Sequence, residues 1–212
     1  FTKVPESASL PLQIVDSEIV KADDVFERKL SDRSVHDDFE FKPVTVNSKD
    51  VTKWAAQLLL ALEKLHVLGV VCCDLNMNNL LIDEAGDLVL TYMCSIADEK
   101  IFKTNTDFSL APELFSFDKI SSAVDWWSYG AILYELLIGV PLKSVHPEGI
   151  TSYSVLRVPK YVSPEGRSLL KQLLAYDASE RLGCGARGTE DIKTHPFFNS
   201  VSWEQLVNKY IV

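Results

Sequence analysis

Residues 124–138 read Val-Asp-Trp-Trp-Ser-Tyr-Gly-Ala-Ile-Leu-Tyr-Glu-Leu-Leu-Ile, and this stretch decides the fold. Its length and its high content of apolar residues predict a strongly apolar helix. No apolar run in the chain approaches the ~18 residues that a membrane-spanning helix needs, and residues 1–6 do not resemble a signal peptide. The stretch therefore predicts a helix in the core of a globular domain.

Two further helices are predicted, one on each side of this stretch. The first begins near Ser48, the expected N-cap, has Asp50 near the positive end of the helix dipole, and ends at Gly69. Its apolar residues recur at spacings of three and four, which predicts one buried face: Val51, Trp54, Ala55, Leu58, Leu62 and Leu65. The second begins at Ser163, with Pro164 in its first turn, and its expected core residues are Leu169, Leu170, Leu173 and Leu174.

A small β-hairpin is predicted between the first helix and the apolar stretch. Two short apolar runs, Leu80–Ile82 and Leu88–Leu90, flank residues 83–87, which read Asp-Glu-Ala-Gly-Asp and predict a turn. A polar loop, residues 72–79, precedes this hairpin.

The composition excludes several classes of protein. The 212 residues include 21 basic and 30 acidic side chains, which give a net charge of −9, whereas nucleic-acid binding usually shows as a basic surplus. The four cysteines have no C-x-x-C spacing, so no zinc site is predicted and reduced thiols of a cytoplasmic protein are expected. We therefore expect no nucleic-acid partner and no direct insertion into a membrane.

Several short motifs follow one another along the chain. Residues 72–79 read Cys-Cys-Asp-Leu-Asn-Met-Asn-Asn, residues 111–113 read Ala-Pro-Glu, and residues 125–130 read Asp-Trp-Trp-Ser-Tyr-Gly. Residues 181–183, Arg-Leu-Gly, and residues 191–198, Asp-Ile-Lys-Thr-His-Pro-Phe-Phe, come later. In this order and spacing the motifs resemble the large lobe of the AGC serine/threonine protein kinases, whose catalytic loop reads His/Tyr-Arg-Asp-Leu-Lys-Pro-x-Asn.

The resemblance covers about residues 51–206 and implies a protein kinase-like fold. This would be a mainly α-helical C-terminal lobe with a small β-hairpin at the catalytic loop, and residues 207–212 would begin a C-terminal tail. Residues 1–50 contain no glycine, although a glycine-rich phosphate loop needs glycine to bring its backbone close to phosphate. We therefore expect an N-terminal lobe that is absent or vestigial, and we interpret residues 1–50 as a partly disordered insert between lobes or a remnant of the small lobe.

The catalytic positions that the resemblance implies are only partly kept. Asp74 stands at the position of the base, and Asn79 stands at that of the magnesium-binding asparagine of the nucleotide site. Asn76, which is neutral, replaces the loop lysine that steadies the transferring phosphate. Tyr92 replaces the aspartate that bridges magnesium to the phosphates, and a phenol with a pKa of about 10 is a poor ligand for this hard cation. We therefore expect no cofactor, and ATP with magnesium only if phosphoryl transfer survives.

Other positions are assigned structural roles by the resemblance. Glu113 and Arg181 would form the ion pair between the activation segment and a later helix, and Asp125 would accept backbone N–H bonds from the catalytic loop. Thr106 aligns with the threonine that usually bonds the catalytic aspartate. The arginine that usually binds the phosphate of the activation segment is replaced by Cys73, so ordering of that segment by phosphorylation is not expected.

Within this family the chain is most similar to the branch of delta-type ribosomal protein S-six kinases and kinase-like pseudokinases. The residues that carry this resemblance are Asp74-Leu75-Asn76, Leu90-Thr91-Tyr92 and residues 146–150, His-Pro-Glu-Gly-Ile, in which His146 would be structural. Members of the branch are associated with endosomes. The resemblance therefore implies a cytoplasmic protein and, by resemblance alone, an association with endosomes.

Three functions are compatible with these residues. The first is a pseudokinase that serves as a protein-docking or scaffold module in signalling or endosomal trafficking, with residues 106–110 and 140–161 as candidate surfaces. The second is a weakly active serine/threonine protein kinase that transfers the γ-phosphate of ATP to protein substrates. The third is an ATP-binding switch without turnover. We prefer the first, with other proteins as partners, because the magnesium-binding aspartate and the glycine-rich loop are missing.

Overall fold

The structure is a computed structural model, and it describes residues 46–91, 110–115 and 120–210. The chain divides into two compact units, Phe1–Lys42 and Pro43–Val212. All the described residues belong to the second unit. The interpretation of residues 1–50 as an insert or a small-lobe remnant therefore falls almost entirely outside the described residues.

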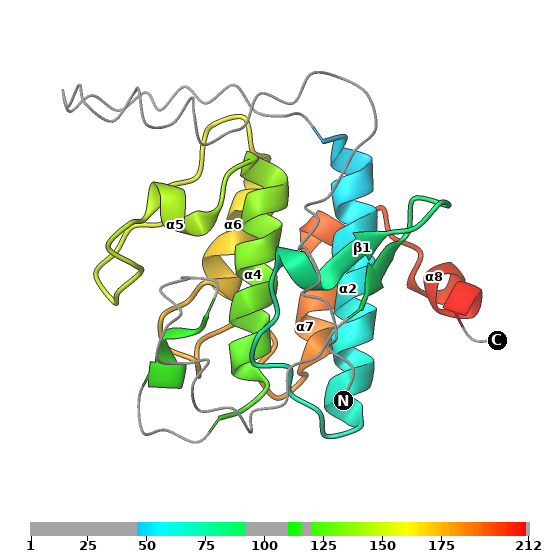
Figure 1. Ribbon diagram of the computed structural model, residues 1–212, viewed down its shortest axis with the longest axis horizontal. Helices are drawn as coiled ribbons and strands as arrows, with labels where there is room; N and C mark the ends of the chain where they lie inside the picture. The colour runs from blue at the N-terminus through cyan, green and yellow to red at the C-terminus, as the bar shows by residue number, and fades with distance from the viewer. Residues whose placement is uncertain (1–45, 92–109, 116–119, 211–212) are drawn as a thin grey trace, which may run out of the picture. The chain divides into compact units, whose positions relative to one another are not determined.

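The apolar stretch forms helix α4, Ala123–Ile138, as predicted. Helix α4 packs between α2, Ser48–Val67, and α6, Pro164–Leu173 (Figure 1). The hydroxyl of Tyr129 in α4 donates a hydrogen bond to the backbone carbonyl of Ala55 in α2, at 2.9 Å. The core gathers around α4, whose largest buried side chains are Trp126, Trp127, Tyr129 and Tyr134.

A glycine sets the separation of α4 and α6. A Cβ atom added at Gly130 would lie 2.9 Å from the Cβ atom of Leu173. Any larger residue would therefore push the two helices apart. Gly139 then ends α4 in the left-handed conformation, with φ of 82°, and its N–H donates to the Glu135 carbonyl at 2.7 Å.

The predicted N-cap of α2 is wrong by one residue. Asn47 caps the helix, because its side-chain oxygen accepts a hydrogen bond from the backbone N–H of Lys49 at 3.1 Å. Ser48 is the first helical residue, and its carbonyl accepts the hydroxyl of Thr52 at 3.0 Å. Both residue types are good caps. The predicted start of α6 at Ser163 is correct to within one residue: the helix begins at Pro164, and the Ser163 hydroxyl caps it by accepting the Gly166 N–H at 3.0 Å.

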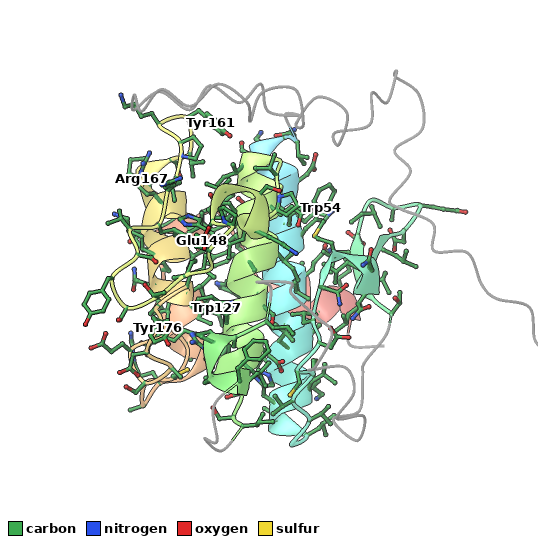
Figure 2. The ribbon with its side chains drawn as sticks, turned by 60° about the vertical axis from the view of Figure 1, so that its left-hand side comes forward. Trp54, Trp127, Glu148, Tyr161, Arg167 and Tyr176 are labelled. Atoms are coloured by element: carbon green, nitrogen blue, oxygen red, sulfur yellow. The ribbon has the colours of Figure 1, made fainter. Side chains whose placement is uncertain are left out.

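The predicted hairpin is confirmed and lies on α2. Strands β1, Leu80–Ile82, and β2, Leu88–Leu90, are antiparallel, and Leu81 pairs with Val89. From α2, the indole N–H of Trp54 donates to the Gly86 carbonyl at 3.0 Å (Figure 2 labels Trp54). Gln57 adds two bonds to the same hairpin: it donates to Asp87 and accepts the backbone N–H of Leu88, each at 2.9 Å.

Residues 146–163, which lead into α6, are held by side chains rather than by helices or strands. Residues 146–163 contain no helix or strand. The ring of His146 accepts the backbone N–H of Arg157 at 3.1 Å, and the hydroxyl of Tyr134 donates to the Arg157 carbonyl at 2.7 Å. Arg167 in α6 donates to the Val158 carbonyl at 2.8 Å and the Pro159 carbonyl at 3.1 Å. His146 is therefore a buried structural residue, as the resemblance implied.

Shorter elements complete the described part of the chain. These are η1, Met77–Asn79; η2, Pro112–Phe115; α5, Leu142–Val145; α7, Thr189–Lys193; η3, Pro196–Phe198; and α8, Trp203–Tyr210. Across the described ranges, no helix combines the length and the apolar character that crossing a membrane requires.

Candidate functional site

Asp125 holds the start of loop 72–79 from the first turn of α4. One of its carboxylate oxygens accepts the backbone N–H of Cys72 at 2.9 Å, and the other accepts that of Cys73 at 2.8 Å. The carboxylate is fully buried, so these donors replace the water that it has lost. The loop is thereby fixed to the core helix, in the arrangement that the resemblance implied.

His66 is a third partner of Asp125, and the sequence pattern does not reveal this contact. The Nε2 atom of His66, in the last turn of α2, lies 2.7 Å from the Asp125 carboxylate. The imidazole ring also packs edge-on against Trp126, with ring centroids 4.8 Å apart. The only sequence signal was a histidine near the end of a helix, which is also the position of an ordinary helix-dipole partner.

Cys73 occupies the position of the arginine that would bind an activation-segment phosphate. Its backbone is in the left-handed region, with φ of 62°, and its side chain is buried. The neighbouring thiol of Cys72 is buried too, and burial together with the nearby charge of Asp125 raises the pKa of Cys72 to about 12. A buried thiol at position 73 supplies no cation for a phosphate group.

Asn76 turns back onto Asp74, the residue at the base position. The Asn76 side-chain amide donates to the Asp74 carboxylate at 3.2 Å and to the Asp74 backbone carbonyl at 3.1 Å. Its side-chain oxygen accepts the backbone N–H of Asn78 at 3.0 Å. The sequence predicted that a charge is lost at position 76. In the structure, the Asn76 amide that replaces this charge donates hydrogen bonds to Asp74.

Asn79 is buried against the same loop. Its side-chain amide donates to the Asp74 carbonyl at 2.8 Å, so Asp74, Asn76 and Asn79 lie together. The backbone carbonyl of Asn79 accepts the N–H of Thr91 at 3.0 Å and the hydroxyl of Thr91 at 3.2 Å. The chain therefore passes next to Asn79 immediately before residue 92. Tyr92 itself lies outside the described residues.

Glu113 and Arg181 form the ion pair that the resemblance implied. The guanidinium of Arg181 contacts both carboxylate oxygens of Glu113, at 2.5 and 3.0 Å. It also donates to the Ala123 carbonyl at 2.7 Å and lies 5.1 Å from the ring centroid of Trp127. Arg181 is fully buried, so the pair ties η2 to the start of α4. Thr106, which was expected to bond Asp74, lies outside the described residues.

The buried α4, the loop that Asp125 anchors and the Glu113–Arg181 pair together define the large lobe of a protein kinase. Sequence comparison supports this assignment, because the protein kinase domain family matches residues 17–198. The chain belongs to the protein kinase family. Its described part is mostly helical with one two-stranded sheet, which corresponds to the C-terminal lobe.

Individual relatives place the chain near the ribosomal protein S6 kinases. It is 43% identical to "Ribosomal protein S6 kinase-like 1" of Mus musculus, over 74% of this chain and 29% of that protein. It is also 43% identical to "Ribosomal protein S6 kinase delta-1" of Homo sapiens, over 74% of this chain and 15% of that protein. The "cAMP-dependent protein kinase type 3" of Saccharomyces cerevisiae is 37% identical, over 74% of this chain and 42% of that protein. The chain thus spans less than half the length of each of these relatives.

The donor set does not fit the magnesium ion that protein kinases use. In the family, two residues hold the metal: an aspartate after the hairpin and the asparagine of the catalytic loop. Here the described loop offers the neutral side-chain oxygen of Asn79, and the resemblance to the family implies that Tyr92, a phenol, stands at the aspartate position. Magnesium prefers carboxylate and phosphate oxygens. These residues therefore supply no anionic protein ligand at the two positions.

Proposed function

We propose that this chain is a pseudokinase: it keeps the large lobe of a protein kinase as a module that binds other proteins and has lost phosphoryl transfer. The observation that carries the proposal is the geometry of loop 72–79. The position of the phosphate-steadying lysine is held by an amide, Asn76, which bonds Asp74 at 3.1 and 3.2 Å instead of presenting a cation.

The chemistry of phosphoryl transfer explains why this loop matters. The transferring phosphate carries its charge on three oxygens, and kinases depend on cations placed around them to stabilise the transition state. Cys73 and Asn76 remove two positive charges from the loop, and Tyr92 removes the principal metal carboxylate. A base at position 74 cannot replace these charges, because proton removal contributes little when the phosphoryl group is not stabilised.

The architecture, in contrast, is complete where it is described. Asp125 retains its donors, Arg181 retains Glu113, and α4 is buried between α2 and α6. These groups stabilise a lobe and do no chemistry, so their presence beside an altered catalytic loop supports a role for the lobe as a binding module. The resemblance to the S-six kinase branch is what supports placing that role in signalling or endosomal trafficking.

A phosphate-transfer assay tests the proposal. The full chain, incubated with magnesium and γ-labelled ATP and a basic protein substrate, is expected to incorporate no more label than its Asp74→Asn variant. Incorporation clearly above that variant would show a working kinase. ATP binding without incorporation would indicate the ATP-binding switch instead.

A restored variant sharpens the assay. Asn76→Lys combined with Tyr92→Asp returns the loop cation and the metal carboxylate, and Asn78→Lys combined with Tyr92→Asp is the matched control, because Asn78 is an exposed neighbour on the same loop. Label incorporated only by the first pair assigns the lost activity to positions 76 and 92. If neither double variant incorporates label, further parts of the catalytic site are missing as well.

A further inference from the structure

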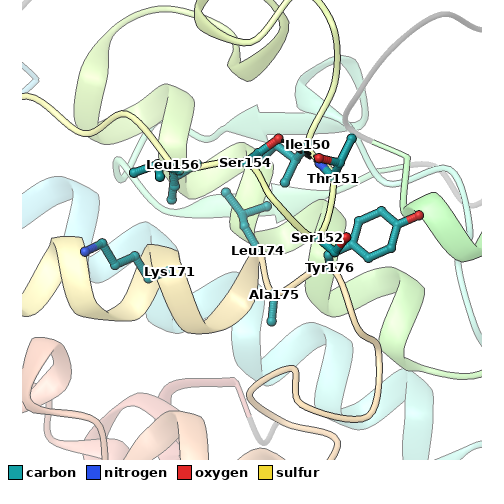
Figure 3. A pocket seen from close by; sticks show the side chains of 10 residues that line it. Ile150, Thr151, Ser152, Ser154, Leu156, Lys171, Leu174, Ala175 and Tyr176 are labelled. Carbon is teal, nitrogen blue, oxygen red and sulfur yellow. Dashed lines mark hydrogen bonds between the residues drawn. The ribbon is translucent and has the colours of Figure 1, made fainter.

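A pocket lies on the lobe away from the catalytic loop, between residues 150–156 and the C-terminal end of α6 (Figure 3). Its volume is about 340 Å³. Leu174, the residue that follows α6, lies near the centre of the pocket, with Leu156 on one side of it and Tyr176 on the other (Figure 3). None of the pocket residues belongs to loop 72–79.

Large apolar side chains surround this pocket and are exposed to solvent. Tyr153 is 94% exposed, Val155 is 80% exposed and Tyr176 is 45% exposed. Val155 and Tyr176 line the pocket, and Tyr153 lies between two lining residues, Ser152 and Ser154. Apolar side chains gathered around a pocket and left in water are typical of a surface that a partner covers.

The charge of the pocket is opposite to that of the whole chain. Lys171 is the one charged residue among the lining residues, and no carboxylate lines the pocket, although the chain has a net charge of −9. Lys171 forms no ion pair with any described residue. The flanking carboxylates are Glu148 and Asp177, and Asp177 is occupied by the N–H and hydroxyl of Ser179. The ammonium group of Lys171 is directed along α6, away from Leu174 and Tyr176 (Figure 3). An ammonium group that no described carboxylate pairs with favours a ligand that carries a carboxylate at that end of the pocket.

The wall formed by residues 150–156 is fixed before any ligand arrives. The backbone N–H of Thr151 donates to the Ser154 hydroxyl at 2.9 Å, and the two side-chain oxygens lie 3.1 Å apart. Arg157, at the end of the wall, is held on both sides by His146 and Tyr134. A wall of this kind does not have to be ordered on binding, which lowers the entropic cost of association.

We propose that this pocket, hereafter the α6 groove, binds a short extended segment of a partner protein in which an apolar residue and an aspartate or glutamate stand a few residues apart. The apolar residue lies over Leu174 between Val155 and Tyr176, and the carboxylate pairs with Lys171 at the other end of the groove (Figure 3). A volume of about 340 Å³ accommodates only a few side chains, so the ligand is a short linear segment bound weakly and transiently. The proposal rests on the docking function proposed above and names its site and the chemistry of its partner.

An anionic membrane is the alternative occupant of such an apolar surface, but the charges disfavour it. Attraction to anionic lipids needs a cluster of basic residues. The α6 groove offers a single lysine on a chain whose net charge is −9.

The test is a selection of peptides on the full chain. Phage-displayed heptapeptides are selected on the immobilised chain, and the recovered sequences are expected to share an aromatic or aliphatic residue and, a few positions away, Asp or Glu. A labelled peptide of that sequence is then titrated by fluorescence polarisation. Lys171→Glu is expected to weaken its Kd by about tenfold, because an attraction becomes a repulsion, and Val155→Asp should weaken it similarly.

The matched control is Lys64→Glu. Lys64 and Lys171 are both exposed lysines in the last turn of a helix, but Lys64 lies on α2 and does not line the groove. Its variant should bind the peptide within about twofold of the native chain. Circular dichroism checks that all variants are folded.

Several results would contradict the proposal that the α6 groove binds such a segment. These are recovered peptides without a carboxylate, no recovered sequence, equal effects of Lys171→Glu and Lys64→Glu, or binding of phosphatidylserine vesicles that Val155→Asp abolishes. Incorporation of label in the phosphate-transfer assay would instead contradict the proposed loss of phosphoryl transfer. The two proposals can therefore fail separately.

Discussion

Arg181 shows most clearly how a single residue supports this lobe. Its guanidinium is buried and binds Glu113, the Ala123 carbonyl and the Ala175 carbonyl at once. A buried ion pair adds little net stability, but the removal of one partner leaves the other charge buried without compensation. The effect of substitution at Arg181 should therefore depend on whether Glu113 remains.

Arg181→Met is expected to lower the free energy of unfolding by about 3–5 kcal/mol. The double variant Arg181→Met with Glu113→Leu should lose less, because no charge is stranded. Urea unfolding measures both. Arg187→Met is the control, since Arg187 is 67% exposed in its pair with Asp191, and it should cost less than about 1 kcal/mol. Equal costs for Arg181→Met and Arg187→Met would contradict this account.

Residue types were easier to predict than their contacts. The sequence identified Asp125 and the pair of Glu113 and Arg181, because each belongs to a motif. It did not reveal that His66 bonds Asp125 or that Asn76 bonds Asp74. The first contact joins residues far apart in the chain, and the second depends on the backbone path of a loop, so neither leaves a periodic pattern.

At the scale of elements, the hairpin depends on one buried carboxylate. Asp87 precedes β2 and is bound by Lys209 of α8, by Lys53 of α2 at 3.0 Å, and by Gln57. The hydrogen bond from Lys209 is the largest of the effects that hold the pKa of Asp87 well below its usual range, and those from Lys53 and Gln57 also lower it. The hairpin, α2 and α8 therefore share an electrostatic contact.

This contact makes stability dependent on pH. Asp87 stabilises the folded state fully above its unfolded pKa of about 4, and the contribution is lost as the pH falls toward the lowered folded value. Asp87→Asn should lower the free energy of unfolding by about 1–3 kcal/mol at neutral pH. The difference from the native chain should shrink between about pH 5 and pH 3.

Glu84→Gln is the matched control for this experiment, because Glu84 is an exposed carboxylate of the same turn. It should leave the stability and its pH dependence nearly unchanged. A difference between Asp87→Asn and the native chain that stays constant from neutral to acid pH would mean that the charge of Asp87 is not what matters.

The contact of α4 with α6 yields a prediction about packing. Gly130→Ala places a Cβ atom 2.9 Å from the Leu173 Cβ, and overpacking of this kind costs about 1–3 kcal/mol. Gly166→Ala, also in a helix, meets the Val162 side chain at 3.2 Å and should be tolerated better. Thermal unfolding compares the two. If Gly130→Ala melts no lower than Gly166→Ala, α4 and α6 are not packed as described.

Elements with a local signal could be predicted, and those held by distant side chains could not. Helix α4, the hairpin and the cap of α6 follow from apolar runs, turn residues and Ser163-Pro164. The structure of residues 146–163 does not, because it depends on bonds from His146, Tyr134 and Arg167 to the backbone. Sequence pattern alone marked residues 140–161 as a candidate surface and residues 146–150 as similar to the S-six kinase branch.

In the molecule as a whole, the packing of a kinase lobe and the charged groups of its catalytic site have to be considered separately. The packing of α2, α4 and α6 and the ion pair to η2 are present. In the function that we propose, the charged groups that phosphoryl transfer needs are replaced at positions 73, 76 and 92. The same lobe carries the α6 groove, with a cation and exposed apolar side chains on a surface that catalysis does not use.

The most direct test of the central claim is a thermal melt of the full chain with ATP, in magnesium and in excess chelator. Because the protein offers no carboxylate for the metal at position 92, we expect the same Tm in both conditions. A rise of several degrees that requires magnesium would contradict it, since only a chain that holds a magnesium–nucleotide complex would be stabilised in this way.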